Sequence, residues 1–383
     1  MGGENDLTCH PGKVLTQPAR AQLTTPPVGD LTALTEAAIG SEFFTGPHLA
    51  GDLSSFLAEQ HPRIAQLARR TAVGEFTHIF FVGSGGSWSC MYSGKYLIDH
   101  LCGIPADVTT GYELTWRDPS RLDARSLVFL ASYSGATEDT LAALRHANAR
   151  GAHTVALVRR RPSPMAREAA EVVDYDSSAL YVLPLAAVYL FALELARVTK
   201  GSRGSEADGV LEGLLGLPPV IEDAFREART PMLDQARRFL SANLLYTVGA
   251  GPLYGLAYKF ALTVFMENMR VHGSVIESTE LRHGPVEMLE RQRADMVFLL
   301  GSDASRPLTQ RAIDIATGAG ARALVLDAAD YRGLDPLLAP FVLLVPLQWF
   351  VVYGALLRGI GDLDERVFMG HRVLASGPDA TWP

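Results

Sequence analysis

Hydrophobic positions along the chain alternate between short continuous apolar runs and longer stretches with helical spacing. Residues 78–82, 126–131 and 154–158 are short apolar runs, whereas apolar residues recur every three to four positions over residues 54–70. A short apolar run followed by a small-residue loop and a helical stretch is typical of a strand–loop–helix unit. Units of this kind in series predict an α/β fold with a parallel sheet and helices on both of its faces. The helices between these strands are predicted at residues 89–101, 138–149 and 179–196.

The same pattern recurs in the second half of the chain. A helix near residues 218–240 leads to a strand at 244–248, a Gly-Ala-Gly-Pro loop and a helix over residues 256–270. Strands are then predicted at residues 296–300 and 323–326, on either side of a helix around 307–319. The sequence therefore predicts two tandem α/β domains, each a parallel β-sheet flanked by helices.

Composition suggests where these two domains begin and end. Residues 1–40 are rich in Thr, Pro, Gly and Ala and have little periodicity, which is typical of a loosely ordered extension. The Gly- and Ser-rich stretch 201–209 indicates a flexible break between domains. We therefore expect a first domain over residues 41–203, a second over 204–360 and a C-terminal tail over 361–383.

Composition and charge restrict the class of protein. The chain has 383 residues, of which 48% are hydrophobic and 20% charged, as in a globular protein of two or three domains. The net charge of −8 gives no basic field for nucleic acid or an anionic membrane, so neither partner is expected. The three cysteines, Cys9, Cys90 and Cys102, form no disulfide framework. The chain shows no signal peptide at its start, so a cytoplasmic location is expected.

Two apolar runs, residues 179–196 and 340–358, could be mistaken for membrane spans. Pro184 and Glu194 interrupt the first run, and Pro340, Pro346 and Gln348 interrupt the second. A spanning helix needs about 20 nearly uninterrupted apolar residues. We therefore expect two buried helices in a soluble protein.

Two loops rich in small residues follow consecutive strands of the first domain. Residues 83–87 read Gly-Ser-Gly-Gly-Ser, and residues 132–137 read Ser-Tyr-Ser-Gly-Ala-Thr. Hydroxyls and backbone N–H groups at a helix N-terminus suit a phosphate group. Each loop alone could also be a tight turn with a Ser or Thr cap. The spacing matches neither G-x-G-x-x-G nor a P-loop, and mononucleotide binding remains open.

These loops resemble the two phosphate loops of sugar isomerase (SIS) domains. The resemblance implies two flavodoxin-like three-layer sandwiches and a bound sugar phosphate. Ala136 stands where the family commonly has an acidic residue. The positions implied to bind substrate are Gly85, Ser87, Ser132, Ser134 and Thr137, with Tyr133 contributing its backbone.

The segment 265–285 concentrates ionisable residues. Glu267 stands among apolar residues of a predicted helix, where partial burial would raise its pKa and make it a better base. His283 precedes Gly-Pro and could shuttle protons at physiological pH. Alternatively, Glu267 could pair with Arg270 on the helix surface, and His272 could cap that helix. Glu280 could pair with Arg282 or His283, and no metal-ligand pattern emerges, so no metal is expected.

The turn at residues 280–285, Glu-Leu-Arg-His-Gly-Pro, is similar to that in the isomerase domain of glucosamine-6-phosphate synthase. That domain places its proton-shuttling Glu sixteen positions before the His of this turn, and 283 − 267 = 16. The resemblance implies that Glu267 moves a proton between C1 and C2 and that His283 opens the sugar ring from a neighbouring subunit. Glu280 is expected to contact the substrate. An active site shared between subunits implies a homodimer or a higher homo-oligomer.

Three departures separate the chain from the synthase. Val264 occupies the position of a synthase lysine, the C-terminal lysine tail is missing, and residue 2 is glycine instead of a cysteine nucleophile. Glutamine-driven synthesis is therefore not expected.

A denser resemblance is to fructoselysine-6-phosphate and related fructosamine-phosphate deglycases. It covers roughly residues 50–370 and is denser in the second half, for example over residues 246–253, 258–259, 266–267, 272–273, 275–278, 282–285, 299–306, 338–341 and 364–366. The resemblance implies cleavage of a 6-phosphorylated Amadori compound to an aldose 6-phosphate and a free amine, with no cofactor. A ketose–aldose sugar-phosphate isomerase and an amino-sugar-phosphate enzyme stay open as alternatives. A sugar-phosphate-sensing module ranks third, because no basic helix-turn-helix segment accompanies the chain.

Overall fold

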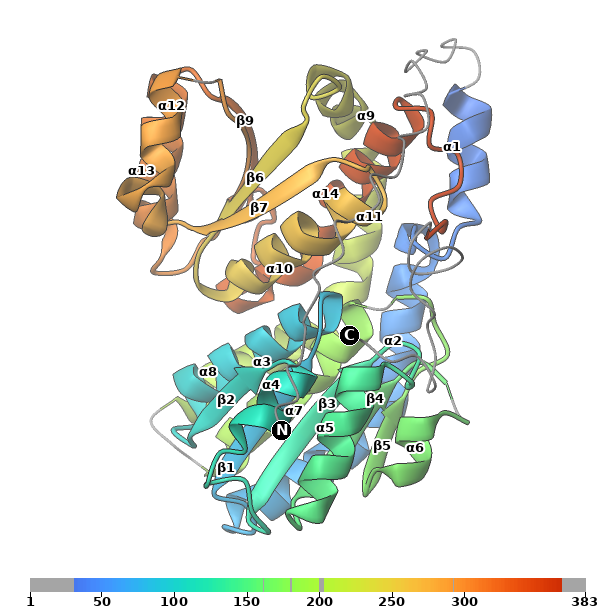
Figure 1. Ribbon diagram of the computed structural model, residues 1–383, viewed down its shortest axis with the longest axis vertical. Helices are drawn as coiled ribbons and strands as arrows, with labels where there is room; N and C mark the ends of the chain where they lie inside the picture. Colours follow the sequence, from blue (N-terminus) through green and yellow to red (C-terminus); the bar gives the residue numbers. More distant parts are fainter. Residues whose placement is uncertain (1–30, 161, 180, 200–202, 292, 367–383) are drawn as a thin grey trace, which may run out of the picture.

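The fold contains two parallel β-sheets. The structure is a computed structural model, and it describes residues 31–160, 162–179, 181–199, 203–291 and 293–366. The first sheet has the strand order β2-β1-β3-β4-β5 and fills the lower half of Figure 1, and the second sheet lies above it. The strands of the first sheet are β1 (His78–Gly83), β2 (Ala106–Thr109), β3 (Ser126–Ser132), β4 (His153–Val158) and β5 (Glu171–Asp174).

The central strands of the first sheet are apolar because both of their faces are covered. Every residue of β3 is buried, as is expected where helices cover both sides of a parallel sheet. Strand β1 lies between β2 and β3, and its last residue Gly83 pairs with Ala131 of β3. The strand order reverses between β1 and β3, and ligands of open α/β sheets bind at the carboxyl ends of strands at such a point.

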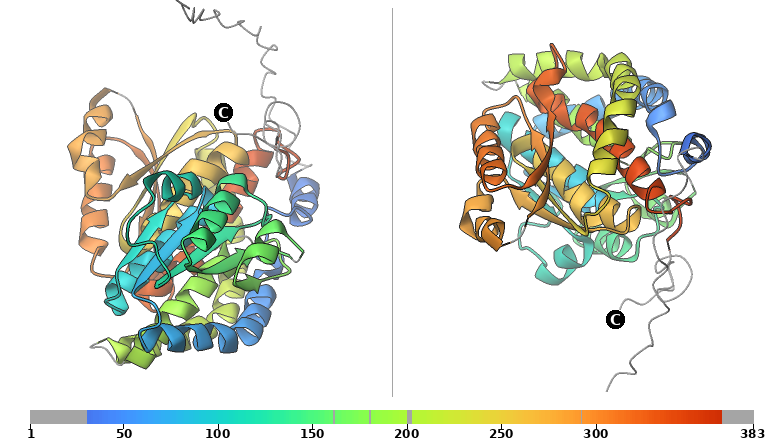
Figure 2. Two further views of the ribbon diagram at one scale, coloured as in Figure 1. Left: turned by 60° about the horizontal axis from the view of Figure 1, so that its bottom comes forward. Right: turned by 90° about the horizontal axis from the view of Figure 1, so that it is seen from above.

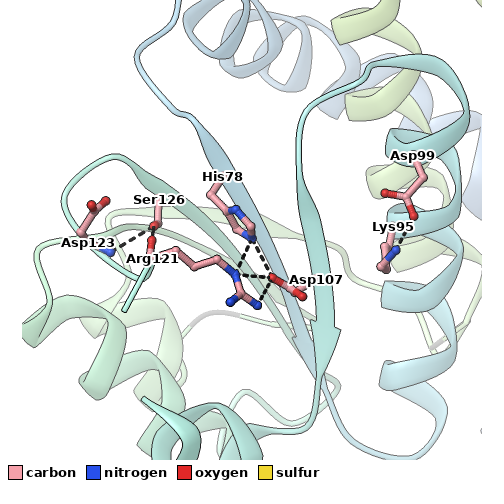
Figure 3. A network of polar contacts seen from close by, with 7 residues as sticks. All are labelled: His78, Lys95, Asp99, Asp107, Arg121, Asp123 and Ser126. Atoms are coloured by element: carbon pink, nitrogen blue, oxygen red, sulfur yellow. Dashed lines mark hydrogen bonds and ion pairs between the residues drawn. The ribbon is translucent and has the colours of Figure 1, made fainter. Parts of the chain in front are cut away.

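Polar side chains hold the opposite end of β1. Nε2 of His78 lies 2.7 Å from Oδ2 of Asp107, and Nε and Nη2 of Arg121 donate to the same oxygen at 2.8 and 2.6 Å. Figure 3 shows the three side chains converging between β1, β2 and the segment before β3. This network fastens the edge strand β2 to the sheet and lies away from the strand ends that bind ligands.

Two groups of helices cover the first sheet. On one face the core contains residues of α2 (Gly46–Ala72), α3 (Gly86–Leu101) and α7 (Val182–Thr199). On the other face it contains residues of α4 (Gly111–Arg117), α5 (Glu138–Ala149) and α6 (Pro164–Glu168). Figure 2 shows the strands between these two helical layers. The first sheet is thus the middle layer of a three-layer sandwich, and its strand order is that of flavodoxin-like folds.

The second sheet has four parallel strands in the order β7-β6-β8-β9. They are β6 (Leu244–Gly249), β7 (His272–Glu277), β8 (Asp295–Leu300) and β9 (Arg322–Asp327). Helices α12 (Met288–Arg291) and α13 (Arg306–Gly318) pack on one face of this sheet. On its other face lie α9 (Leu217–Arg238), α10 (Tyr254–Lys259) and α14 (Ala339–Leu356). The prediction of an α/β protein with parallel sheets flanked by helices is confirmed.

One hydrophobic core runs through the layer of helices between the sheets. It joins inward residues of β1 and β3 to inward residues of β8 and β9 through α2, α7, α9 and α14. Phe44 packs edge-on against Trp349 of α14 with the ring centroids 4.7 Å apart, and Tyr189 of α7 donates to the carbonyl of Leu337 at 2.7 Å. The expected boundary near residue 203 therefore separates the two sheets, but the helices that lie between the sheets share one core cluster.

The two apolar runs form helices of this shared core. Val182–Thr199 and Pro336–Leu356 are long and apolar enough to cross a membrane by length and composition, but 83% and 100% of their apolar windows are buried. Helix α14 is apolar on all sides, a pattern typical of a helix surrounded by protein.

Several elements differ from the sequence prediction. The last part of the expected N-terminal extension forms α1 (Leu31–Ile39), and residues 1–30 lie outside the described residues. Helix α8 (Gly204–Leu215) occupies most of the expected flexible break. His272 begins the edge strand β7 and does not cap a helix, which corrects that alternative. The helix expected over 256–270 is divided into α10, a π-helical turn (Phe260–Val264) and α11 (Phe265–Glu267).

Candidate functional site

The first loop lies at the carboxyl end of β1, where α3 begins. Gly85 has φ +55°, a left-handed conformation that favours glycine, and it directly precedes the first residue of α3. The hydroxyl of Ser84 donates to the carboxylate of Asp139 at the start of α5. This bond ties the two predicted loops together beside the N-terminus of a 16-residue helix, a position that favours an anion.

The second loop is organised around Ser132, the last residue of β3. Its Oγ lies 2.7 Å from Oγ1 of Thr137 and accepts from the backbone N–H groups of Gly135 and Thr137 at 3.1 and 3.4 Å. Ser132 is buried, whereas Ser134 and Thr137 are exposed. The buried hydroxyl therefore shapes the loop, and the exposed hydroxyls are available to a ligand.

Tyr133 points away from this loop toward a cation. The Cζ atom of Arg159 lies 4.9 Å from the centre of the Tyr133 ring, and its Nη1 also pairs with Glu42 at 2.8 Å. Burial raises the pKa of Tyr133 to about 12. The Tyr133 side chain thus fixes the loop from outside, in keeping with a substrate role limited to its backbone.

A cavity of about 310 Å³ lies beside the first loop. It brings Gly85 and Thr137 together with Glu267, although Glu267 belongs to the second half of the chain. Among the described residues, Ser87, Ser132, Tyr133 and Ser134 do not line it. Ser84 and Gly86 of the predicted first loop also line it. The polar lining residues to which sequence reasoning gave no role are Thr45, Ser178, Lys259, Thr263, Asn268, Gln348 and Arg366.

Glu267 is the last residue of α11 and is more exposed than the sequence suggested. Its side chain is 47% exposed, and its Oε2 lies 3.4 Å from Nε of Arg366. Arg270 is not its partner, because Nη2 of Arg270 donates to the carbonyl of Glu365 at 2.8 Å. The expected partial burial and the alternative pairing with Arg270 are both corrected: the carboxylate is open to the cavity and held by an arginine from the expected tail.

Lys259 lies in the same cavity with almost no solvent exposure. Lys259 is 6% exposed, and its Nζ lies 5.3 Å from the centre of the Tyr181 ring. Burial lowers the pKa of Lys259, and the negative charge of Glu267 acts in the opposite direction. Sequence reasoning gave Lys259 no role.

His283 and Glu280 line a different cavity, of about 510 Å³, next to β7. Nε of Arg282 lies 3.2 Å from Nε2 of His283. None of the described residues lines both cavities. A single chain therefore does not bring His283 and Glu267 to one cavity.

The titratable groups of the described residues offer no evident place for a metal ion. In that part of the chain, no group of three or more His, Cys, Asp or Glu side chains could hold one. The first cavity instead combines hydroxyls, two amides, a carboxylate and two cationic side chains. Such a set can bind a phosphorylated polyol and move protons on it.

Comparison with known proteins places this arrangement in a family. The SIS domain model matches residues 75–198, which contain the first sheet and both loops. The fructoselysine 6-phosphate deglycase of Escherichia coli O157:H7 is 31% identical over 333 residues, which are 87% of this chain and 97% of that protein. The fructosamine deglycase of Bacillus subtilis (strain 168) is 34% identical over 70% of this chain and 83% of its own length.

A solved structure agrees with this placement. The crystal structure of a candidate phosphosugar isomerase from Bacillus subtilis superimposes with a TM-score of 0.72 at 30% identity, covering 79% of this chain and 95% of that one. The similarity thus extends over both sheets and not only over the segment that the domain model matches. The chain belongs to the SIS domain family of enzymes and is a relative of the deglycases of that family.

Proposed function

We propose that this protein is a deglycase that cleaves a 6-phosphorylated Amadori compound, such as fructoselysine 6-phosphate, to an aldose 6-phosphate and a free amine. The observation that carries the proposal is the shared cavity, in which Glu267 lies with Gly85 and Thr137 of the two loops. Two relatives named as deglycases, at 31% and 34% identity, support the choice of reaction.

In this proposal the substrate phosphate binds at the loops. The N-terminus of α3 and the hydroxyl of Thr137 provide donors, and a hydrogen bond with Ser132 holds Thr137 in place. Ser87, Ser134 and the backbone of Tyr133 complete the predicted set. Phosphate binding then fixes C1 and C2 of the sugar beside Glu267, which converts binding energy into orientation.

Glu267 carries out the proton transfers. As a carboxylate it removes a proton from C1 of the open-chain ketosamine, which gives an enaminol. The carboxylic acid that results returns the proton to C2, which leaves an imine at C1. Water then hydrolyses the imine to the aldose phosphate and the amine. A positioned acid–base group typically contributes about 10²–10⁴-fold to such a reaction.

His283 opens the sugar ring in this proposal, and it does so in the active site of a second subunit. The separation of His283 and Glu267 into two cavities supports this arrangement. It implies a homodimer or a higher homo-oligomer with shared active sites, in which Glu280 contacts the substrate beside His283.

The domain organisation and the setting are part of the same proposal. Each sheet with its helices corresponds to one SIS domain, over residues 41–203 and 204–360. The similarity to bacterial metabolic enzymes supports a hydrolase of the cytoplasm. Neither a cofactor nor a metal takes part in the reaction described.

The experiment that tests the function is an assay of amine release. The protein is incubated with 6-phosphofructose carrying different amino acids on C1, and aldose phosphate and free amine are measured together. We expect equal amounts of both products and no turnover in Glu267→Gln. Glu290→Gln is the matched control, because Glu290 is exposed and lines neither cavity.

A second candidate function is a ketose–aldose sugar-phosphate isomerase. It is favoured by the similarity to the candidate phosphosugar isomerase of Bacillus subtilis. The same assay separates the two functions. Interconversion of a plain ketose phosphate with its aldose, without release of amine from any ketosamine, would replace the deglycase by the isomerase.

A further inference from the structure

A π-helical turn places Lys259 and Glu267 on the same side of one helix. In a regular α-helix each residue turns about 100° around the axis, so positions seven apart point in nearly the same direction, whereas positions eight apart differ by about 80°. Here the N–H of Phe265 donates to the carbonyl of Phe260, so this turn contains one extra residue. The extra residue therefore brings the side chains of Lys259 and Glu267 closer in direction around the helix axis, and both line the same cavity. Such π-turns often occur at functional sites.

The ammonium group of Lys259 has no carboxylate partner of its own. Among the described residues, no Asp or Glu oxygen lies within the 4.0 Å of an ion pair from its Nζ, and its close neighbour is the Tyr181 ring. Burial lowers the pKa of Lys259, and the fully buried thiol of Cys90 beside it has a pKa raised to about 12. A nearby negative charge stabilises a poorly solvated cation more than it stabilises a solvated cation.

A buried acceptor lies in the same cavity. Gln348 of α14 is 6% exposed, and its Nε2 donates to Oγ1 of Thr45 at 3.0 Å. Its Oε1 is buried and has no hydrogen-bond partner among the described residues. An unpaired buried amide oxygen destabilises the fold, because it has lost its hydrogen bonds to water without replacement. A ligand hydroxyl in the cavity would satisfy it.

We propose that Lys259 is a further catalytic residue of this site. Its ammonium group binds the oxygen on C2 of the substrate and stabilises the negative charge that develops there. Gln348 accepts a hydrogen bond from a neighbouring hydroxyl of the substrate. The proposal rests on the function proposed above, since it concerns the proton transfer that Glu267 begins.

The step is balanced without any further reactant. Glu267 takes the C1 proton, and the C1–H electron pair becomes the C1=C2 bond. The electron pair of the C2=O bond moves to the oxygen, which the Lys259 ammonium protonates. When Glu267 returns its proton to C2, the nitrogen lone pair forms the C1=N bond. The C2 oxygen keeps its proton as a hydroxyl, and a proton from solvent restores Lys259.

The test is the variant Lys259→Met, which keeps the length of the side chain and removes its charge. We expect kcat, and the rate at which the C1 proton exchanges into D₂O, to fall at least about 100-fold, the loss typical of removing one oxyanion donor. The Kd of sorbitol 6-phosphate, an unreactive acyclic ligand, should stay within threefold. The melting temperature should be unchanged or higher, because a buried charge is replaced by an apolar group.

Two results would overturn the proposal. Turnover and exchange within threefold of the wild type would remove the catalytic role. A rise in the Kd of sorbitol 6-phosphate as large as the loss of kcat/KM would make Lys259 a ligand of the phosphate instead. Lys95→Met is the matched control, because Lys95 pairs with Asp99 on α3 and lines neither cavity.

A second variant covers the case in which Lys259→Met does not fold. Lys259→Ala is assayed with added ethylamine, which can occupy the space left by the side chain; restored turnover supports the proposal, and a folded variant without rescue contradicts it. If the wild type releases no amine but exchanges the C1 proton of a ketose phosphate, the deglycase function fails while the Lys259 test is read from that exchange.

Discussion

Nε of Arg366 lies 3.4 Å from Oε2 of Glu267, and this ion pair joins the segment after α14 to the end of α11. Both side chains line the first cavity. The same segment is held by Asn268, whose Nδ2 donates to the carbonyl of Leu363 at 2.8 Å. Part of the expected C-terminal tail is therefore a wall of the candidate active site.

Replacing Arg366 should impair turnover more than stability. In Arg366→Met the carboxylate of Glu267 loses the group that orients it, and we expect kcat to fall about ten- to a hundredfold. The pair is partly exposed, so its loss should change the free energy of unfolding by no more than about 1 kcal/mol. Steady-state kinetics and thermal melts check both. Arg270→Met is the control, and an equal loss of kcat there would mean that the arginines only anchor the segment.

Ser132 should act through the phosphate. In Ser132→Ala, Thr137 and two backbone N–H groups lose a shared partner, and phosphorylated ligands should bind about tenfold more weakly, the equivalent of about one hydrogen bond. Isothermal titration with phosphorylated and unphosphorylated sugars measures this difference. Ser278→Ala is the matched control, because Ser278 forms a similar buried pair with Thr309 at 2.8 Å. Equal weakening for both kinds of sugar would contradict the assignment of the loop.

Asp107 should stabilise the fold at neutral pH but not in acid. Burial acts to raise the pKa of Asp107, but hydrogen bonds from His78 and Arg121 outweigh it and hold the pKa below its ordinary value of 3.8. The stabilisation is therefore present above pH 3.8 and is lost as the pH falls through the lower pKa of the folded state.

We thus expect Asp107→Asn to unfold at a lower denaturant concentration than the wild type at pH 7, and this difference should disappear toward pH 2. Asp99→Asn removes an exposed ion pair shown in the same view and should have little effect at either pH (Figure 3). A constant difference for Asp107→Asn across this pH range would show that the effect does not come from the charge.

Gly255 should be needed for the contact between the two halves. A Cβ atom at this position would lie 2.6 Å from the carbonyl oxygen of Ser89 and 2.8 Å from Oγ of Ser93, because α10 packs directly on α3 (Figure 1). We expect Gly255→Ala to lose about 1–3 kcal/mol of stability, as in other overpacked cores. It should also lower kcat, since Lys259 and Glu267 move with α10 and α11 relative to Gly85.

Chemical denaturation and kinetics on the same preparation test the role of Gly255. Gly209→Ala is the control, because Gly209 lies within α8 with no atom within 4 Å of an added Cβ, and alanine there should stabilise the helix. An unchanged free energy of unfolding in Gly255→Ala would mean that α10 can move away from α3 without destabilising the fold.

Sequence alone predicts the central strands well. Strands β1, β3 and β4 are buried on both faces, so they appear as continuous apolar runs, and β1 and β3 end in small residues. The edge strands β2, β5 and β7 were not predicted, since each is short or polar, whereas the edge strand β9 contains an apolar run and was predicted. His272-Gly-Ser, for example, has no apolar run, and it becomes a strand only beside β6.

The candidate site was predicted in part, for a similar reason. Gly85, Thr137 and Glu267 stand in local patterns that can be read along the chain, and they do meet in one cavity. Lys259 was missed because positions eight apart on a regular α-helix differ in direction by about 80°, a difference that the π-turn reduces. Arg366 was missed because it lies in a segment without a recognisable pattern and because its partner, Glu267, is far away in the sequence.

The hydrophobic core shared by the two sheets has a consequence for how the chain unfolds. A cut between α7 and α8 would leave α2 and α7 of one half, and α9 and α14 of the other, with wide apolar faces in water. Calorimetry should accordingly record a single cooperative transition. Such a transition would mean that the two halves unfold together, and a chimaera that exchanges one half with a relative would then also have to exchange the helices of the shared core.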